Sequence, residues 1–257
     1  MKLIPCGRSI EWLYRAFRAA DWRLPRVPSR LAARKHGVKQ VSHDLRHRTI
    51  PVTPFMQNCS LVWSTVSGRG VVIDPGGDAE RIKSAVREEA VTLERVLLTH
   101  AHLDHAAGAR QFADSYAVPL EGPHPDDQFW LDLMPQQSAR YGFPATAAFA
   151  PDRWLYDGDA VDCGGLPLQV LHCPGHTPGH VVFFHAAGLA FVGDVLFAGS
   201  IGRSDFPRGD HATLIRSIRE KLWPLGDAVV FVPGHGPEST FGFERRTNPF
   251  VADALFE

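Results

Sequence analysis

The sequence predicts an α/β protein with a sheet-rich core and helices packed on its outside. After about residue 44, short apolar runs typical of strands alternate with amphipathic runs typical of helices. With 257 residues, 44% of them hydrophobic, the chain is long enough for one good-sized domain, alone or with an appendage. Histidines and aspartates directly follow several of the apolar runs, and open α/β sheets tend to build their sites at the carboxyl ends of strands.

The first fifty residues differ in composition from the rest of the chain. They contain 12 Lys/Arg against 3 Asp/Glu, whereas the remainder contains 15 against 25. Residues 9–21 have the apolar spacing of an amphipathic helix, which Pro25 and Pro28 would end. We therefore expect a basic N-terminal extension over residues 1–44 and one folded domain over residues 45–257.

The folded region predicts strands and helices in a mixed order. Short apolar or alternating runs bounded by turn residues indicate strands, and longer amphipathic runs indicate helices, the first with Asp78 as its N-cap. Strands are expected at residues 48–52, 59–66, 70–77, 95–99, 117–122, 166–173, 180–185, 188–194 and 227–234. Helices are expected at residues 78–90, 104–116, 125–134 and 211–225.

Composition also narrows the location and the partners. Four cysteines without a C-x-x-C pair form no disulfide framework, which favours a reducing, cytoplasmic location. No apolar run reaches the ~18 residues of a membrane span, and no apolar signal core is expected at the N-terminus. The acidic balance after residue 50 is opposite to that of a phosphate-binding surface, so no nucleic-acid partner is expected.

The N-terminal extension has three interpretations. Its basic amphipathic run is compatible with contact to a membrane surface or another anionic partner. Its Arg-rich, acid-poor composition also fits an organelle presequence, although three serines are few for one. A disordered tail, or a start assigned too far upstream, requires the fewest assumptions, and we favour it.

The segment THAHLDH, residues 99–105, carries the strongest chemical signal in the sequence. It follows a predicted buried strand, and residues i and i+2 of an extended segment point the same way, so His100 and His102 can reach one metal ion. Asp104 and His105 come slightly later, where the chain turns into a helix, and are available for a second ion. Four ligand-type residues within six positions are improbable as an ordinary surface loop.

Three more ligand-type residues follow predicted strands. His176 lies in the Pro/Gly turn of PGHTPGH, Asp194 stands alone within an apolar run, and His235 follows the last strand. An isolated buried carboxylate is costly unless it is paired or metal-bound. Five imidazoles and two carboxylates suit Zn²⁺, with Fe or Mn as alternatives, and seven ligands exceed one tetrahedral site. Two divalent ions sharing a carboxylate fit this number better.

These motifs resemble those of the metallo-β-lactamase fold superfamily, in particular the short, single-domain glyoxalase II-like hydrolases. The resemblance rests on THAHLDH, PGHTPGH, GD (193–194) and PGHGP (233–237), and covers about residues 45–250. It implies an αββα sandwich and a dinuclear metal site at one edge. The first ion would be held by His100, His102 and His176, the second by Asp104, His105 and His235, and Asp194 would bridge both.

The resemblance implies a hydrolase that cleaves a small-molecule thioester, with S-D-lactoylglutathione or a related acyl-thiol as substrate. GRSDFPRGDH (202–211) and ERRTNPF (244–250) resemble characteristic segments of the short subclass. Only 22 residues follow His235, so the helical glutathione-binding domain of two-domain glyoxalase II is not expected. Asp104 is a candidate catalytic residue, because it could orient the attacking hydroxide as well as bind metal.

Other functions of the same fold remain as alternatives. A persulfide dioxygenase would use one iron on His100, His176 and Asp194. A metallo-β-lactamase is disfavoured because no secretory signal is expected, and a nuclease because the core region is acidic. Another small substrate is also possible, as is a non-catalytic scaffold, although a scaffold would be marked by lost ligands and all seven candidates are present.

Several neighbouring residues have structural interpretations as well as functional ones. His172 is as well explained by backbone hydrogen bonds as by a supporting role at the metal site. Arg203 is expected to form a salt bridge that fixes its loop rather than to bind a substrate carboxylate. Asp74 ends a strand and is expected to stabilise a turn or a ligand from behind. The aromatic residues of 125–134 and 137–144 are expected to be ordinary packing rather than a roof over the site.

Overall fold

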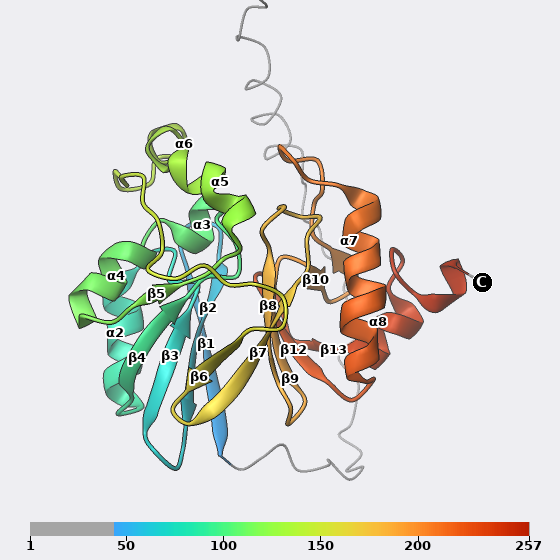
Figure 1. Ribbon diagram of the computed structural model, residues 1–257, viewed down its shortest axis with the longest axis horizontal. Helices are drawn as coiled ribbons and strands as arrows, with labels where there is room; N and C mark the ends of the chain where they lie inside the picture. The colour runs from blue at the N-terminus through green and yellow to red at the C-terminus, as the bar shows by residue number, and fades with distance from the viewer. Residues whose placement is uncertain (1–43, 257) are drawn as a thin grey trace, which may run out of the picture. The chain divides into compact units, whose positions relative to one another are not determined.

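The computed structural model describes residues 44–256, which form two β-sheets packed face to face with helices on both outer sides (Figure 1). The first sheet has the order β1-β2-β3-β4-β5 and the second the order β13-β12-β9-β8-β7-β6. The first sheet comprises β1 (Leu45–Val52), β2 (Gln57–Ser64), β3 (Arg69–Ile73), β4 (Thr92–Leu97) and β5 (Leu120–Glu121). The second comprises β6 (Ala160–Cys163), β7 (Leu166–His172), β8 (Val181–His185), β9 (Leu189–Gly193), β12 (Val230–Pro233) and β13 (Ser239–Thr240), and β10 (Leu196–Phe197) pairs separately with β11 (Ser200–Ile201).

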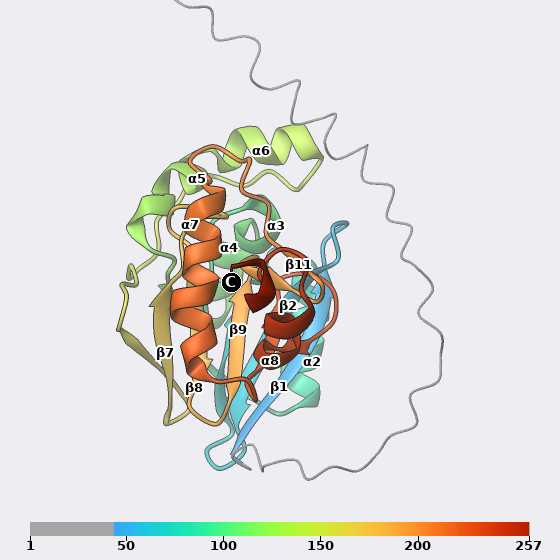
Figure 2. The ribbon, with the colours of Figure 1, turned by 90° about the vertical axis from the view of Figure 1, so that its right-hand side faces the viewer.

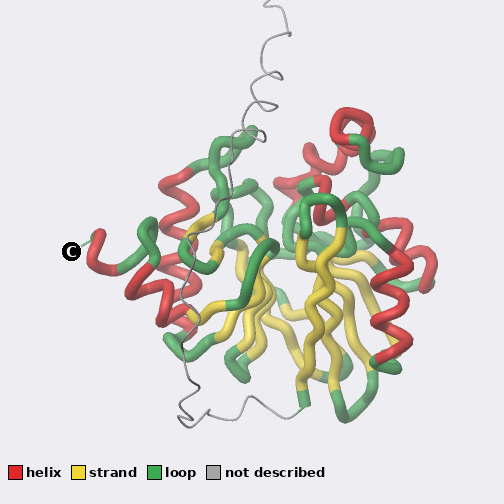
Figure 3. The backbone as a smooth tube through the Cα atoms, turned by 180° about the vertical axis from the view of Figure 1, so that it is seen from behind, coloured by secondary structure: helices red, strands yellow, loops and turns green. Residues whose placement is uncertain are grey.

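The helices form the two outer layers, as the orthogonal and rear views show (Figures 2 and 3). The expected αββα arrangement of an α/β protein is thereby confirmed. On the side of the first sheet lie α2 (Ala79–Glu88), α3 (Leu103–Ala106), α4 (Ala109–Tyr116), α5 (Gln128–Asp132) and α6 (Met134–Tyr141). On the side of the second sheet lie α7 (His211–Ser217) and α8 (Phe241–Thr247).

Three apolar clusters hold these layers together. Alternation along β3 sends Val71 toward the second sheet and Val72 toward the helices, because successive strand residues face opposite sides. Between the sheets, Val71 belongs to a cluster with Phe183 and Phe191. A third cluster joins the second sheet to α7 and α8. Each sheet is therefore buried on both faces, and its strand ends are the parts left free to build a site.

The carboxyl ends of four strands meet at one edge of the molecule. In the second sheet β9 runs parallel to β12, and β7 runs in the same direction because both β7 and β9 are antiparallel to β8. Val181 N donates to Thr99 O at 2.8 Å, which ties the loop after β4 to the start of β8. Asn58 N donates to Gly234 O at 2.7 Å, which joins the two sheets again beside the loop after β12.

Some local predictions were wrong in detail. β4 ends at Leu97 rather than at residue 99. Asp78 is the N-cap residue of α2, as predicted, but its side chain makes no capping hydrogen bond, because its Oδ2 accepts from Thr53 N at 2.8 Å instead. The expected helix at residues 104–116 is two helices, α3 and α4. They are separated at Gly108, where the backbone approaches Pro75 O so closely that a side chain would not fit.

Two expectations concern the membrane and the extension. Within residues 44–256 no helix has the length and apolar character that crossing a bilayer demands. The predicted extension over residues 1–44 lies outside the described residues except for Asp44, so its boundary and its role stay predictions.

Candidate metal centre

The structure brings all seven predicted ligand residues to the edge where the strand ends meet. The loop after β4 and helix α3 supply four of them, and the loops after β7, β9 and β12 supply one each. Six of the seven are fully or largely buried, and the His235 side chain is 31% exposed. The residues are His100, His102, Asp104, His105, His176, Asp194 and His235.

The first cluster consists of three imidazoles with converging nitrogens. His100 Nε2 lies 3.1 Å from His102 Nδ1, which lies 2.9 Å from His176 Nε2. Ligand nitrogens of a tetrahedral zinc site lie about 3.3 Å apart, since each zinc–nitrogen bond is about 2.0–2.1 Å long. The three nitrogens are therefore already spaced as ligands of a single ion.

The second cluster contains Asp104, His105 and His235, and Asp194 stands between the two clusters. His235 Nε2 lies 3.1 Å and His105 Nε2 3.8 Å from Asp104 Oδ2. Asp194 Oδ1 is 3.4 Å from His105 Nε2, and its Oδ2 is 3.5 Å from His176 Nε2 and 3.8 Å from His235 Nε2. One carboxylate thus reaches both clusters, as a bridging ligand must.

Hydrogen bonds behind the imidazoles direct their lone pairs inward. His105 Nδ1 lies 2.9 Å from Asp74 Oδ2, His176 Nδ1 lies 2.6 Å from Arg203 O, and His100 Nδ1 lies 3.0 Å from Thr99 Oγ1. An imidazole that donates its outer N–H to an oxygen keeps its other nitrogen unprotonated, which is the form that binds metal. We assign this tautomer to all three histidines.

The electrostatics of the first cluster favour neutral imidazoles. Burial, together with the neighbouring imidazoles, holds the pKa of His100 and of His102 well below the usual range. Both rings are therefore unprotonated near neutral pH and present lone pairs to a cation.

The second cluster carries the negative charge of the site. Burial would raise the pKa of Asp194, but His105 and His235 outweigh it and hold that pKa well below the usual range. Burial would likewise lower the pKa of His105, yet the carboxylates of Asp194 and Asp104 raise it well above normal. The two shifts are mutual: the imidazoles favour the ionised form of Asp194, and the carboxylates favour positive charge beside them. A bound divalent ion would supply that positive charge.

Buried polar atoms without hydrogen-bond partners are a further sign that these residues fit a metal ion. His105 Nε2 and Asp194 Oδ1 are buried, and neither has a hydrogen-bond partner among the described residues. Buried polar atoms are nearly always paired, and orphans of this kind call for an explanation such as an ion. The spacing, the orientation and the charge of the donors all fit divalent metal ions.

Comparison with known proteins agrees with this geometry. A family model described as the metallo-beta-lactamase superfamily matches residues 52–235. The chain belongs to the metallo-beta-lactamase superfamily. It is 48% identical over 204 residues to hydroxyacylglutathione hydrolase GloC of Haemophilus influenzae, which covers 79% of this chain and 96% of that protein.

Two solved structures are similar to that of this chain. BLEG-1 B3 metallo-beta-lactamase superposes with a TM-score of 0.74 at 36% identity, over 80% of this chain and 99% of that one. TTHA1623, crystallised in a di-iron-bound form, superposes with a TM-score of 0.71 at 34% identity, over 79% and 100% of the two chains.

Asp74 and His180 lie behind the candidate metal ligands and hold them in place. Asp74, expected only to stabilise a turn or a ligand, accepts hydrogen bonds from Thr99 N and Thr99 Oγ1 at 2.8 and 2.6 Å and also faces His105. His180 is fully buried, lies 4.7 Å from the His100 ring in a stacked arrangement, and accepts from Asp194 N at 3.1 Å. A second histidine in the PGHTPGH motif was the available signal for its role.

A third supporting residue, Asp127, was not singled out from the sequence. Its Oδ1 accepts from Gly179 N at 2.6 Å, and its Oδ2 accepts from Thr177 Oγ1 at 2.8 Å and from Ala101 N at 3.0 Å. Burial raises the pKa of Asp127 to about 7, against these three hydrogen bonds, which favour the ionised form. This carboxylate joins the loop of His100 and His102 to the loop of His176.

The remaining neighbours have the structural roles expected for them, with one exception. Arg203 donates from Nε and Nη2 to the carboxylate of Asp205 at 2.9 and 2.7 Å, as predicted for a loop-fixing salt bridge. His172 Nε2 lies 2.8 Å from Pro178 O, so this side chain has the backbone hydrogen bond that was one of its two expected roles. The aromatic residues of 125–134 were expected to be ordinary packing, but Trp130 lies against the His102 ring, with a centroid distance of 4.7 Å. Phe206, which lies outside the stretches considered, contacts the same ring at the same centroid distance.

Gly234 is the position where a single methyl group should damage the centre most directly. A Cβ there would overlap Asp194 Oδ1 and lie 2.7 Å from His105 Cε1. We expect Gly234→Ala to displace Asp194 and to lower the metal content per chain, measured by mass spectrometry, while the circular dichroism spectrum stays native. Gly142→Asn is the matched control, because Gly142 has a left-handed backbone that Asn tolerates and open space around it. A Gly234→Ala protein with undiminished metal content would contradict the geometry.

Proposed function

We propose that the protein is a metal-dependent hydrolase of small-molecule thioesters, with S-D-lactoylglutathione as the leading candidate substrate. The observation that carries the proposal is Asp194, held within 3.8 Å of nitrogens from both ligand clusters. The 48% identity to a hydroxyacylglutathione hydrolase, over 96% of that protein, supports the reaction class.

The proposal includes two divalent ions, most readily zinc, with iron or manganese as alternatives. His100, His102 and His176 would hold the first ion, Asp104, His105 and His235 the second, and Asp194 both. When bound, such ions act as Lewis acids that polarise an acyl carbonyl and make water nucleophilic near neutral pH. No serine or cysteine nucleophile is required.

The residues of the chain divide the remaining tasks. The side chains of His235 and Asp104 are 31% and 16% exposed, whereas His100 is fully buried, so substrate would approach from the side of the second cluster. Asp104 would orient the attacking water as well as hold metal. Trp130 and Phe206 cover His102 and exclude water from the far side of the centre.

Thiol release from a panel of thioesters tests the proposed reaction. We expect zinc-loaded protein to hydrolyse S-D-lactoylglutathione or another acyl-thiol of the panel, to lose this activity on dialysis against a chelator, and to regain it when zinc is returned. The metal content per chain should follow the activity. Hydrolysis at full rate by metal-depleted protein would overturn the mechanism.

The alternatives are separated by adding two assays to the same preparation. Oxygen uptake with glutathione persulfide, together with one iron per chain, would identify a persulfide dioxygenase instead. Because a B3 metallo-beta-lactamase is among the structural relatives, the panel includes the β-lactam nitrocefin. Opening of nitrocefin without cleavage of any thioester would favour a β-lactamase.

The proposal places the enzyme in the cytoplasm. Three cysteines, Cys59, Cys163 and Cys173, are buried free thiols, as expected in a reducing compartment. We propose no nucleic-acid partner, and contact of the extension with a membrane stays the less favoured interpretation.

A further inference from the structure

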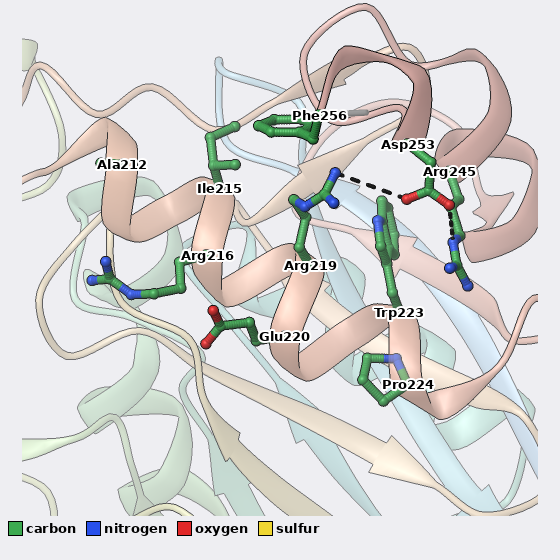
Figure 4. A pocket seen from close by; sticks show the side chains of 10 residues that line it. All are labelled: Ala212, Ile215, Arg216, Arg219, Glu220, Trp223, Pro224, Arg245, Asp253 and Phe256. Atoms are coloured by element: carbon green, nitrogen blue, oxygen red, sulfur yellow. Dashed lines mark hydrogen bonds and ion pairs between the residues drawn. The ribbon is translucent and has the colours of Figure 1, made fainter.

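A pocket lies away from the metal centre, in the outer helical layer that covers the second sheet (Figure 4). It has a volume of about 570 Å³ and is bounded by α7 and its continuation, by Arg245 of α8, and by the C-terminal residues Asp253 and Phe256. The continuation of α7 is a π-helical segment, η2 (Ile218–Leu222), and a short 3₁₀ turn, η3 (Trp223–Leu225). None of the seven candidate metal ligands lines this pocket.

Two hydrogen-bond donors on the wall of this pocket have no acceptor. Arg219 Nη1 and Trp223 Nε1 are both buried, and neither has a hydrogen-bond partner among the described residues. Trp223 as a whole is only 4% exposed. Native proteins leave few buried donors unpaired, because each one loses its water without compensation. Two such donors, one helical turn apart on one pocket wall, indicate a missing acceptor.

The charges around the pocket indicate that this acceptor is an anion. Three arginines line it, Arg216, Arg219 and Arg245, against two carboxylates, Glu220 and Asp253. Asp253 is already engaged, since its Oδ2 accepts from Arg245 Nε at 2.5 Å. Its Oδ1 forms an ion pair with Arg219 Nη1 at 3.8 Å (Figure 4), a distance too long for a hydrogen bond, so the Arg219 N–H still lacks an acceptor.

The helix geometry and the apolar lining of the pocket also indicate a ligand site. Arg219 lies within the π-helical segment, and such segments are rare and frequently occur at functional sites. Ile215 and Pro224 line the pocket beside the polar groups, which leaves room for the apolar body of a ligand. Phe256 lies 3.9 Å over the Arg219 guanidinium and is 47% exposed, so it is the cover that must shift to admit a ligand.

We propose that this pocket binds a small organic oxyanion, a carboxylate or a phosphate ester, whose oxygens accept hydrogen bonds from Arg219 Nη1 and Trp223 Nε1. An arginine fork and a neighbouring indole N–H match the lone pairs of such a group. The site is separate from the metal centre and does not depend on the proposed reaction.

The indole N–H resonance of Trp223 gives a local readout. Zinc-loaded, nitrogen-15-labelled protein is titrated separately with inorganic phosphate and with benzoate, and the resonance is assigned from its loss in Trp223→Phe. We expect at least one probe to move this resonance saturably, while sodium chloride at equal ionic strength does not. Phosphate alone would identify a phosphate site, and benzoate alone a carboxylate site. No saturable movement, or equal movement with chloride, would overturn the proposal.

Two arginine variants test whether Arg219 carries the binding. Arg219→Gln removes the charged donor and should weaken the affinity for the active probe about tenfold or more. Arg87→Gln, on the exposed face of α2 in the opposite layer, is the matched control and should bind like the parent. Equal affinity of the parent and Arg219→Gln would show that the anion binds elsewhere, and a native circular dichroism spectrum confirms that the variants are folded.

Discussion

Asp194→Asn is expected to lose most of its bound metal and to show kcat/KM for thioester hydrolysis lowered about 10³-fold or more, because metal assistance is worth several kcal/mol. The substitution keeps the shape of the side chain and removes its charge. Asp194 is the one carboxylate among the seven candidates whose two oxygens face both clusters, His105 on one side and His176 on the other. An amide supplies one oxygen at most, so the affinity for both ions falls together.

The measurements are metal content per chain, kcat/KM and the melting temperature of each protein. Asp114→Asn is the control, because Asp114 lies on the exposed surface of α4 and its side chain is 64% exposed. The Asp194→Asn melting curve should remain cooperative, which separates loss of metal from loss of fold. A variant that retains its metal and near-normal kcat/KM would exclude the bridging role.

Much of the fold was predictable because the strands are marked locally. The run at 95–99 and the series between 166 and 194 are apolar and bounded by turn residues, and they correspond to β4, β7, β8 and β9. What sequence patterns missed depends on distant contacts. Periodicity continues through Gly108, but the loop after β3 packs so closely there that the helix is interrupted. Asp78 occupies the N-cap position of α2, but its carboxylate accepts a hydrogen bond from Thr53 N rather than from the helix.

The residues of the candidate site also fall into a group that the sequence predicts and a group that it does not. The metal-facing residues could be selected because ligand-type side chains are unusual directly after apolar strands. The residues behind them are ordinary aspartates in sequence, and only folding gives them their partners. Asp74 and Thr99 lie 25 positions apart and Asp127 and Gly179 lie 52 apart. Such pairs leave no periodic signal, so a supporting role could be expected for Asp74 but its partners, and the whole role of Asp127, emerge only when the loops are seen together.

Asp127→Ala is expected to lower the free energy of unfolding by about 3–9 kcal/mol, because three buried donors lose their acceptor at about 1–3 kcal/mol each. The donors are Ala101 N, Thr177 Oγ1 and Gly179 N. A domain is typically stable by only about 5–15 kcal/mol, so the variant should be close to unfolding. Even where it stays folded, the loop of His100 and the loop of His176 lose their common anchor, and metal affinity should fall about 10–100-fold.

Urea unfolding of the metal-depleted and the zinc-loaded protein separates these two effects. Thr177→Val removes one donor together with its bond and should cost much less than Asp127→Ala, because the carboxylate keeps both backbone donors. Asp126→Ala, at the exposed neighbouring position, serves as the surface control. If Asp127→Ala unfolded at the same urea concentration as Asp126→Ala, the carboxylate would contribute no net stability. A destabilised variant that still binds zinc with parental affinity would show that the two ligand loops hold their positions without it.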